Sequence, residues 1–141
     1  MPKLLAIDTS SSITRIALCL EGEIKEYGTD EPRQAAQRLL PLIQAAFSEA
    51  SIGARDLDGI VVVTGPGSFT GLRIGIGVAQ GISVANATSL IGVSSLALLA
   101  QTGITPTESA DFLVCIPARD DEVYLGAYKY DGSVLVLLDR E

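Results

Sequence analysis

Short segments dominated by apolar residues open the chain, and segments of this length are typical of β-strands. Residues 3–7 and 13–20 are largely apolar and predict two buried strands, and residues 23–28 predict a third. Glu21-Gly22, between the second and the third, is a two-residue turn of the kind that joins antiparallel strands. We therefore expect the N-terminal residues to form a three-stranded meander that contains a hairpin.

Helical and strand-like patterns alternate in the middle of the chain. Apolar residues recur every three or four positions from Pro32 to Ala50, which predicts a helix whose start is marked by Asp30-Glu31-Pro32 and which Pro41 is expected to bend. A strand, a helix, a strand and a helix are predicted next at residues 59–64, 68–86, 90–93 and 94–101. This order predicts an α/β fold of the form βββαβαβα.

The strand pattern returns after a turn-rich link at residues 103–107. Three more antiparallel strands are predicted at residues 112–116, 122–130 and 133–138. Asp131-Gly132 is the turn between the last two. The chain ends at Glu141 before any helix that would cover this second set. We expect either a truncated two-lobed protein or strands that pack on another chain.

The composition is that of a globular protein. With 141 residues, 48% of them hydrophobic and 19% charged, the chain is long enough to bury a core without disulfides or metal. No apolar run reaches the ~18 residues that a membrane-spanning helix needs, so we expect a cytoplasmic protein without membrane contact. The net charge of −7 argues against direct binding of nucleic acid. Any RNA is expected to be reached through a partner.

Residues suited to metal binding or acid–base catalysis are scarce. The chain has no histidine, which removes the usual general base and the usual transition-metal ligand. Cys19 and Cys115 lie far apart in apolar segments and are expected to be reduced residues of the core. We therefore expect neither a metal site nor a catalytic residue in this chain.

The segment from Gly65 to Gly81 contains six glycines in seventeen positions and follows a predicted strand. Such a loop often holds a phosphate, but no Lys followed by Ser or Thr stands where a Walker A loop needs it. The dinucleotide fingerprint fails too, because Thr70 takes the place of its third glycine and no acidic residue follows. Both standard nucleotide motifs are excluded for this segment.

Arg73 is the only charged residue between positions 58 and 108, and it falls near the start of a predicted helix. A cation there opposes the helix dipole, so we expect an anionic partner, either Asp8 or a bound anion, or else a side chain that extends into water. Ser68 or Thr70 is expected to cap the helix.

Residues 8–12 join the first two strands and carry one carboxylate and four hydroxyls. The carboxylate of Asp8 could hold a hydrated Mg²⁺ beside a phosphate, or the segment could form an ordinary Asx or Ser/Thr turn. With the glycine-rich loop, this segment defines a candidate vestigial phosphate site composed of Asp8, Thr9, Ser10, Gly65, Gly67, Ser68, Thr70 and Arg73.

The later glycines suggest a different purpose. Gly71, Gly75, Gly77 and Gly81 form two Gly-x-x-x-Gly spacings, and each glycine inside a helix costs about 1 kcal/mol relative to alanine. A stripe without side chains lets another backbone come close, either the sheet of the same chain or a helix of a partner. From the residues alone, both explanations remain open.

Four segments together resemble the TsaB family, also called YeaZ: LAIDTSSS, GPGSFTGLRIGIGVAQG, IGVSSLALLA and ARDDEVYLGAY. They occur in the order found in that family, and the resemblance extends along essentially the whole chain. It implies an actin-like ATPase fold of the ribonuclease H-like type. Residues 1–104 are then expected to form the first lobe, and residues 105–141 the beginning of an incomplete second lobe.

The same resemblance implies an accessory role. Members of the TsaB family are non-catalytic partners that bind and activate TsaD, which acts with TsaE to install threonylcarbamoyladenosine beside the anticodon of tRNA. We then expect no cofactor on this chain alone, with ATP or ADP and Mg²⁺ bound only in the complex. TsaD, or a second copy in a homodimer, is expected to pack on the first two long helices. The expected interface residues are Arg33, Gln37, Pro41, Ile74, Gly77, Val78 and Gly81.

Two other functions are consistent with the residues. One is a nucleotide-dependent phosphotransferase of the actin-like superfamily that uses Asp8 for Mg²⁺ and residues 65–73 for phosphate, although no plausible general base follows Asp8. The other is a homodimer without activity of its own, which would use the same helices as the complex with TsaD.

Overall fold

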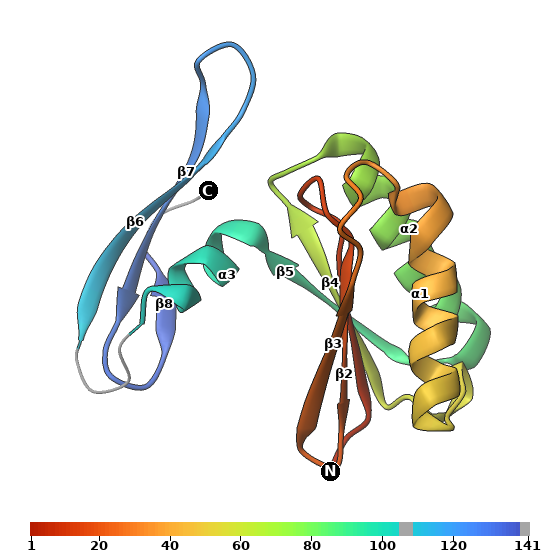
Figure 1. The fold of residues 1–141 in the computed structure, drawn as a ribbon. Coiled ribbons are helices and arrows are strands. Elements are labelled where there is room, and N and C mark those ends of the chain that lie inside the picture. The colour runs from red at the N-terminus through yellow and green to blue at the C-terminus, as the bar shows by residue number, and fades with distance from the viewer. Residues whose placement is uncertain (105–108, 139–141) are drawn as a thin grey trace. The chain divides into compact units, whose positions relative to one another are not determined.

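The structure is a computed structural model that describes residues 1–104 and 109–138. The chain divides into two compact units (Figure 1). The first comprises Met1–Thr64 and Ser68–Gly92, and the second comprises Gly65–Gly67 and the described residues from Val93 onward. Each unit has a core of its own.

The first three strands form the meander that the sequence predicts. β1 (Leu4–Asp8), β2 (Arg15–Leu20) and β3 (Glu23–Gly28) are antiparallel neighbours in one sheet. Glu21 and Gly22, in the turn between β2 and β3, have φ angles of 52° and 87°. A two-residue turn with two positive φ angles matches the twist of the flanking strands, so the predicted hairpin is confirmed.

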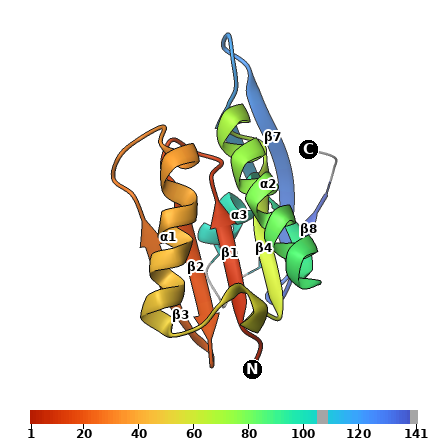
Figure 2. The same ribbon diagram turned by 90° about the vertical axis from the view of Figure 1, so that its right-hand side faces the viewer.

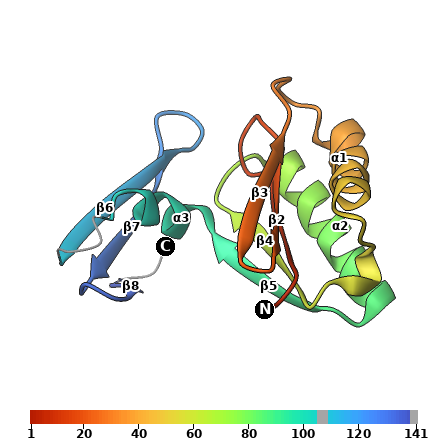
Figure 3. The same ribbon diagram turned by 60° about the horizontal axis from the view of Figure 1, so that its bottom comes forward.

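Helices and parallel strands extend this sheet. The elements that follow are α1 (Ala35–Ala50), the 3₁₀ helix η1 (Ala54–Asp56), β4 (Gly59–Gly65), α2 (Phe69–Asn86) and β5 (Ser89–Ser94). β4 pairs with β1 in parallel, and the strand order is β3-β2-β1-β4-β5. α1 and α2 cover the same face of the sheet (Figures 2 and 3). The predicted α/β order is confirmed.

α1 begins later than its sequence signals predict. A start at Pro32 is wrong because Arg33 adopts a left-handed φ of 62°, which a right-handed helix cannot contain. The helix begins at Ala35 instead. Pro41 lies inside α1, which continues beyond it to Ala50.

Apolar side chains from the sheet and from both helices form the core of the first unit. Its buried members are Leu5, Ile7, Ile16, Leu18, Leu39, Ile43, Ala46, Leu57, Ile60, Val62 and Ala79. Those on strands follow a period of two and those on helices a period of three to four, as the geometry of each element requires. Burying each Leu or Ile contributes roughly 1.5–3 kcal/mol.

The second unit is a small antiparallel sheet with one helix against it. α3 (Ser95–Thr102) contacts β6 (Ala110–Pro117), β7 (Val123–Tyr130) and β8 (Leu135–Leu137), in the strand order β6-β7-β8. Of the predicted link at residues 103–107, the last three lie outside the described residues. The division into lobes at residue 104 stays a prediction, and α3 shares its core with the second sheet.

Burial alternates along β6, and this places Cys115 on the exposed face of its strand. Phe112, Val114 and Ile116 pack towards the core that α3 contributes to. The expectation that Cys115 belongs to the core is therefore wrong, because alternate strand residues face opposite sides of the sheet. Cys19 is half-buried in β2. No helix within the described residues is long and apolar enough to cross a membrane.

Candidate protein interface beside the glycine-rich helix

The loop between β1 and β2 is fastened to the first turn of α2. The backbone N–H of Ser68 donates to the carbonyl oxygen of Ser10 at 2.6 Å. The buried hydroxyl of Thr9 donates to the carbonyl oxygen of Gly71 at 2.7 Å, across 62 residues of sequence. The two polar segments that the sequence singles out thus meet in the first unit.

The hydrogen bonds within these segments are those of an ordinary turn and of a helix cap. Asp8 forms an Asx turn, in which its Oδ1 accepts the N–H of Ser10 at 2.9 Å and the hydroxyl of Ser10 at 2.6 Å. Ser68 caps α2, because its hydroxyl accepts the N–H of Gly71 at 3.2 Å, which confirms one of the two predicted caps. Thr70 is exposed.

These bonds use the groups that a phosphate or a hydrated Mg²⁺ would need. The N–H groups of Ser68 and Gly71 and one oxygen of Asp8 already have partners, so a ligand would have to displace them. Within the described residues, no group of three or more His, Cys, Asp or Glu side chains could hold a metal ion. Gly65 and Gly67 fall in the second unit. The vestigial phosphate site therefore stays a prediction.

Arg73 lies over an aromatic ring. Its guanidinium carbon is 5.2 Å from the centroid of the Phe69 ring, and both side chains are exposed. The ion pairs within the described part of the chain are Lys25–Glu49 and Arg38–Glu31. Asp8 is therefore not the partner of Arg73, and the alternative of a side chain that extends towards water fits the structure.

The four helical glycines divide into two pairs with different surroundings. Gly71 and Gly75 are buried, and a Cβ on either would overlap atoms of Thr9. Gly77 and Gly81 are exposed, and a Cβ on either would meet no atom of the described part of the chain within 4 Å. The close approach of the β1–β2 loop explains the first pair, and no contact among the described residues explains the second pair.

A cavity of about 410 Å³ lies where the β1–β2 loop meets the N-terminal ends of α1 and α2. Its lining residues are Ser11, Ser12, Arg33, Ala35, Ala36, Gln37, Ser68, Thr70, Gly71 and Ile74. Three predicted interface residues, Arg33, Gln37 and Ile74, are therefore brought together. Pro41 lines a second cavity, of about 390 Å³, on the other side of α1 beside residues 29–31. Val78 is half-buried and packs against the core.

The outward surface of α1 and α2 carries exposed apolar side chains and few charges. Leu40 is 51% exposed, Phe69 67% and Val84 84%. The charged residues of the two helices are Arg38, Glu49 and Arg73. Together with the exposed Gly77 and Gly81, these features define what we call the helix face: the exposed residues of α1 and α2.

Two features of this region were not found from the sequence. Leu5, Ile7 and Thr9 are spaced two residues apart, so their side chains lie on the same, buried side of the chain. This spacing could have indicated that Thr9 is buried. Phe69 and Val84 are exposed because they lie on the side of α2 opposite Gly71 and Gly75. Plotting the apolar residues of α2 by their angle around the helix axis would have placed these two on the side away from the core residues.

A meander of three strands followed by α, β, α and β, with both long helices on one face, defines a protein of the actin-like ATPase fold class. The family described as "TsaD: tRNA N6-adenosine threonylcarbamoyltransferase" matches residues 26–139. The chain belongs to this family, and within it to the group of TsaB (YeaZ) proteins.

Named relatives support this assignment. The chain is 36% identical over 131 residues to the "tRNA threonylcarbamoyladenosine biosynthesis protein TsaB" of Escherichia coli (strain K12), an alignment that covers 93% of this chain and 57% of that protein. It is 36% identical over 135 residues to the protein of the same name from Bacillus subtilis (strain 168), with 94% and 57% covered. The solved structure "YeaZ from Pseudomonas aeruginosa" matches with a TM-score of 0.87 at 38% identity, covering 99% of this chain and 65% of that one.

The chain thus spans little more than half the length of the curated relatives that it matches. Those relatives are named for the biosynthesis of threonylcarbamoyladenosine in tRNA.

Proposed function

We propose that this chain is an accessory subunit that binds TsaD and activates it for threonylcarbamoyladenosine modification of tRNA, at the adenosine beside the anticodon. The observation that carries this proposal is the open pair Gly77 and Gly81 on the helix face. Membership of the TsaB group supports the choice of this pathway and of TsaD as the partner.

Energetics favour a partner at this face. Each glycine inside a helix costs about 1 kcal/mol relative to alanine, and for Gly77 and Gly81 no close contact with another described residue offsets that cost. A helix of another protein that approaches the bare backbone would offset it through close packing. Exposed apolar side chains such as Phe69 and Val84 would add buried area at the same face.

The chemistry is proposed to lie in TsaD. The chain has no histidine, and the Asp8 carboxylate is engaged in a turn. We propose that ATP or ADP and Mg²⁺ bind only in the complex, which TsaE joins. The net charge of −7 favours indirect contact with tRNA, in the cytoplasm, through TsaD. A homodimer through the helix face would compete with TsaD for one surface.

Reconstitution tests the proposal. The 141-residue chain, TsaD of the same organism and their mixture would be compared by gel filtration with light scattering and by incorporation of labelled threonine into tRNA. A heterodimer, and activity only when both proteins are present, are expected. Separate elution of the two proteins would contradict the proposal, and so would an activity of TsaD alone that equals that of the mixture.

A further inference from the structure

Residues 29–34, which we call the strap, connect β3 to α1 and lie against the loop between β1 and β2. The N–H of Thr29 donates to the carbonyl oxygen of Thr14 at 3.1 Å, and the N–H of Arg33 donates to that of Ser12 at 2.8 Å. Most of the strap is exposed, and Arg33 has a left-handed φ of 62°. Backbone hydrogen bonds, rather than buried apolar side chains, therefore hold the strap in place.

The start of α1 lacks the local stabilisation that α2 and α3 have. Gln34, the N-cap residue of α1, makes no side-chain capping bond, and the first turn contains no acidic residue. Ser68 and Ser94 cap α2 and α3 through their hydroxyls. An uncapped helix start leaves backbone N–H groups without protein partners and frays more readily.

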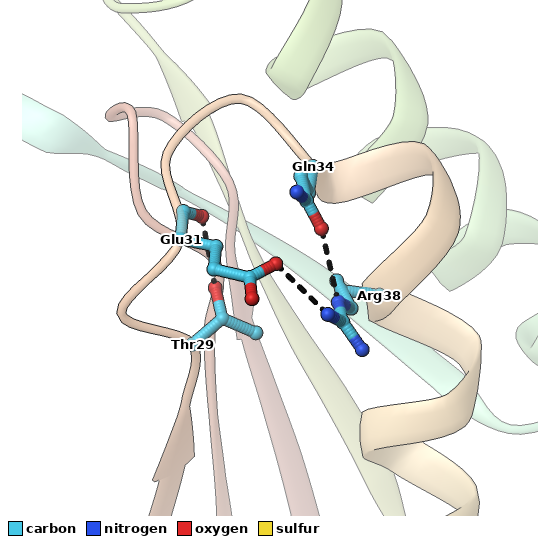
Figure 4. Close-up of polar contacts among 4 residues, drawn as sticks. All are labelled: Thr29, Glu31, Gln34 and Arg38. Carbon is cyan, nitrogen blue, oxygen red and sulfur yellow. Dashed lines mark hydrogen bonds and ion pairs between the residues drawn. The ribbon is translucent and has the colours of Figure 1, made fainter.

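Arg38, in the first turns of α1, ties this uncapped end to the strap (Figure 4). Its Nε donates to Oε1 of Gln34 at 3.0 Å, and its Nη2 donates to Oε2 of Glu31 at 2.8 Å. The hydroxyl of Thr29 donates to the carbonyl oxygen of Glu31 at 3.4 Å. The Arg38 guanidinium also holds the pKa of the Glu31 carboxyl below its usual value.

The strap and the first turn of α1 form one wall of the 410 Å³ cavity. Arg33, from the strap, and Gln37, from α1, line that wall. Ser68, the N-cap residue of α2, and Ile74, within α2, line the cavity as well. A strap that opens would carry Arg33 with it and change the shape of the cavity at the end of the helix face.

We propose that Arg38 is a positioning residue, which holds the strap against the β1–β2 loop and thereby fixes the cavity wall that a partner protein meets. The part of this inference that concerns the partner protein rests on the function proposed above. The side chains of Arg38 and Glu31 are both about half exposed, at 49% and 55%, so their pairing affects local opening more than global stability.

Amide hydrogen exchange of the 141-residue chain tests the first part of this proposal. Arg38→Met keeps the aliphatic stem and removes both hydrogen bonds. We expect exchange at the N–H groups of Thr29 and Arg33 to rise about fivefold, with the thermal midpoint and the exchange in β1 unchanged. Arg38→Lys should restore part of the protection, and 1 M salt should weaken it in the unsubstituted chain.

Arg55→Met is the matched control, because Arg55 is an exposed arginine in η1 that takes part in neither described ion pair. It should leave exchange in the strap unchanged. Unaltered exchange at Thr29 and Arg33 in Arg38→Met would overturn the proposal. An equal rise in β1 and β4 would do so too, since it would mean global destabilisation.

Calorimetric titration with TsaD tests the second part. Arg38→Met should weaken binding about fivefold, and Arg55→Met should not. Faster exchange in the strap with unchanged affinity would overturn the link between strap and partner. If the unsubstituted chain itself fails to bind TsaD, the proposed function fails, and the exchange data still decide whether Arg38 holds the strap.

Discussion

The hydroxyl of Thr9 donates to the carbonyl oxygen of Gly71, and the two residues lie so close that a Cβ on Gly71 would overlap the carbonyl oxygen of Thr9. Thr9 is 1% exposed. This contact joins the end of β1 to the start of α2 and explains why position 71 has no side chain. A phosphate is not needed to account for this glycine.

Alanine at Gly71 should therefore destabilise the fold. Alanine favours a helix by about 1 kcal/mol, but its Cβ would collide with backbone that cannot move away cheaply, so we expect a net loss of roughly 1–3 kcal/mol in the free energy of unfolding. Urea denaturation followed by circular dichroism measures this. Gly77→Ala is the matched control and should gain about 0.5–1 kcal/mol, because no atom in residues 1–104 or 109–138 lies within 4 Å of the added atom. Equal stability of the two variants would contradict the account.

A double-mutant cycle isolates the contact between Gly75 and Thr9. A Cβ on Gly75 would meet the side-chain oxygen and both side-chain carbons of Thr9. Thr9→Ala removes the first of these obstacles together with one carbon, so Gly75→Ala should cost less in that background than in the unsubstituted chain. We expect a coupling of about 0.5–3 kcal/mol by chemical denaturation. Strict additivity would mean that the two residues are not in repulsive contact.

Acidification should weaken the link between β3 and α1. The hydrogen bond from Lys25, followed by that from Tyr27, holds the pKa of Glu49 below its ordinary value of 4.5. A lowered pKa stabilises the fold above pH 4.5, and this contribution is lost as the pH falls through the folded-state value. The difference in thermal midpoint between the unsubstituted chain and Glu49→Gln should therefore shrink between pH 6 and pH 3. Glu23→Gln, also a change from Glu to Gln but outside both ion pairs, is the control; a difference that stays constant with pH would refute the prediction.

The phosphotransferase alternative makes a contrasting prediction about nucleotide binding. The N–H of Ser68 and the carboxylate of Asp8 already make hydrogen bonds to Ser10. We therefore expect titration of the 141-residue chain with ATP and Mg²⁺ to release no binding heat. Calorimetry in the absence of TsaD provides the measurement. Saturable binding that Asp8→Ala abolishes would instead support a working phosphate site.

Most of the fold follows from periodicity. The strand at residues 59–64 could be placed closely because it is an unbroken apolar run, and the strand at residues 23–28 because the Glu21-Gly22 turn marks its start. The start of α1 could not, since Pro32 is a common first helical residue and nothing local reveals the positive φ of Arg33. Cys115 was misassigned because an apolar run does not tell which face of a sheet is covered.

The candidate site was predictable only in part. Spacing alone identified the four helical glycines, but which pair packs inside depends on the loop at Thr9, 62 residues away from Gly71. The tie between Arg38 and Glu31 likewise depends on a strap whose conformation is irregular. Neither kind of contact leaves a periodic signal in the sequence.

Binding of TsaD to chains altered at the open glycines tests the central claim most directly. Leucine at Gly77 or at Gly81 has room in the free chain, so the thermal midpoint should not fall, but it would block a close helix approach. We predict an affinity for TsaD at least about tenfold lower by calorimetry, which corresponds to about 1.4 kcal/mol. Gln101→Leu, at an exposed position of α3, should bind as the unsubstituted chain does. Unchanged affinity in both glycine variants would contradict the assignment of the helix face as the surface that meets TsaD.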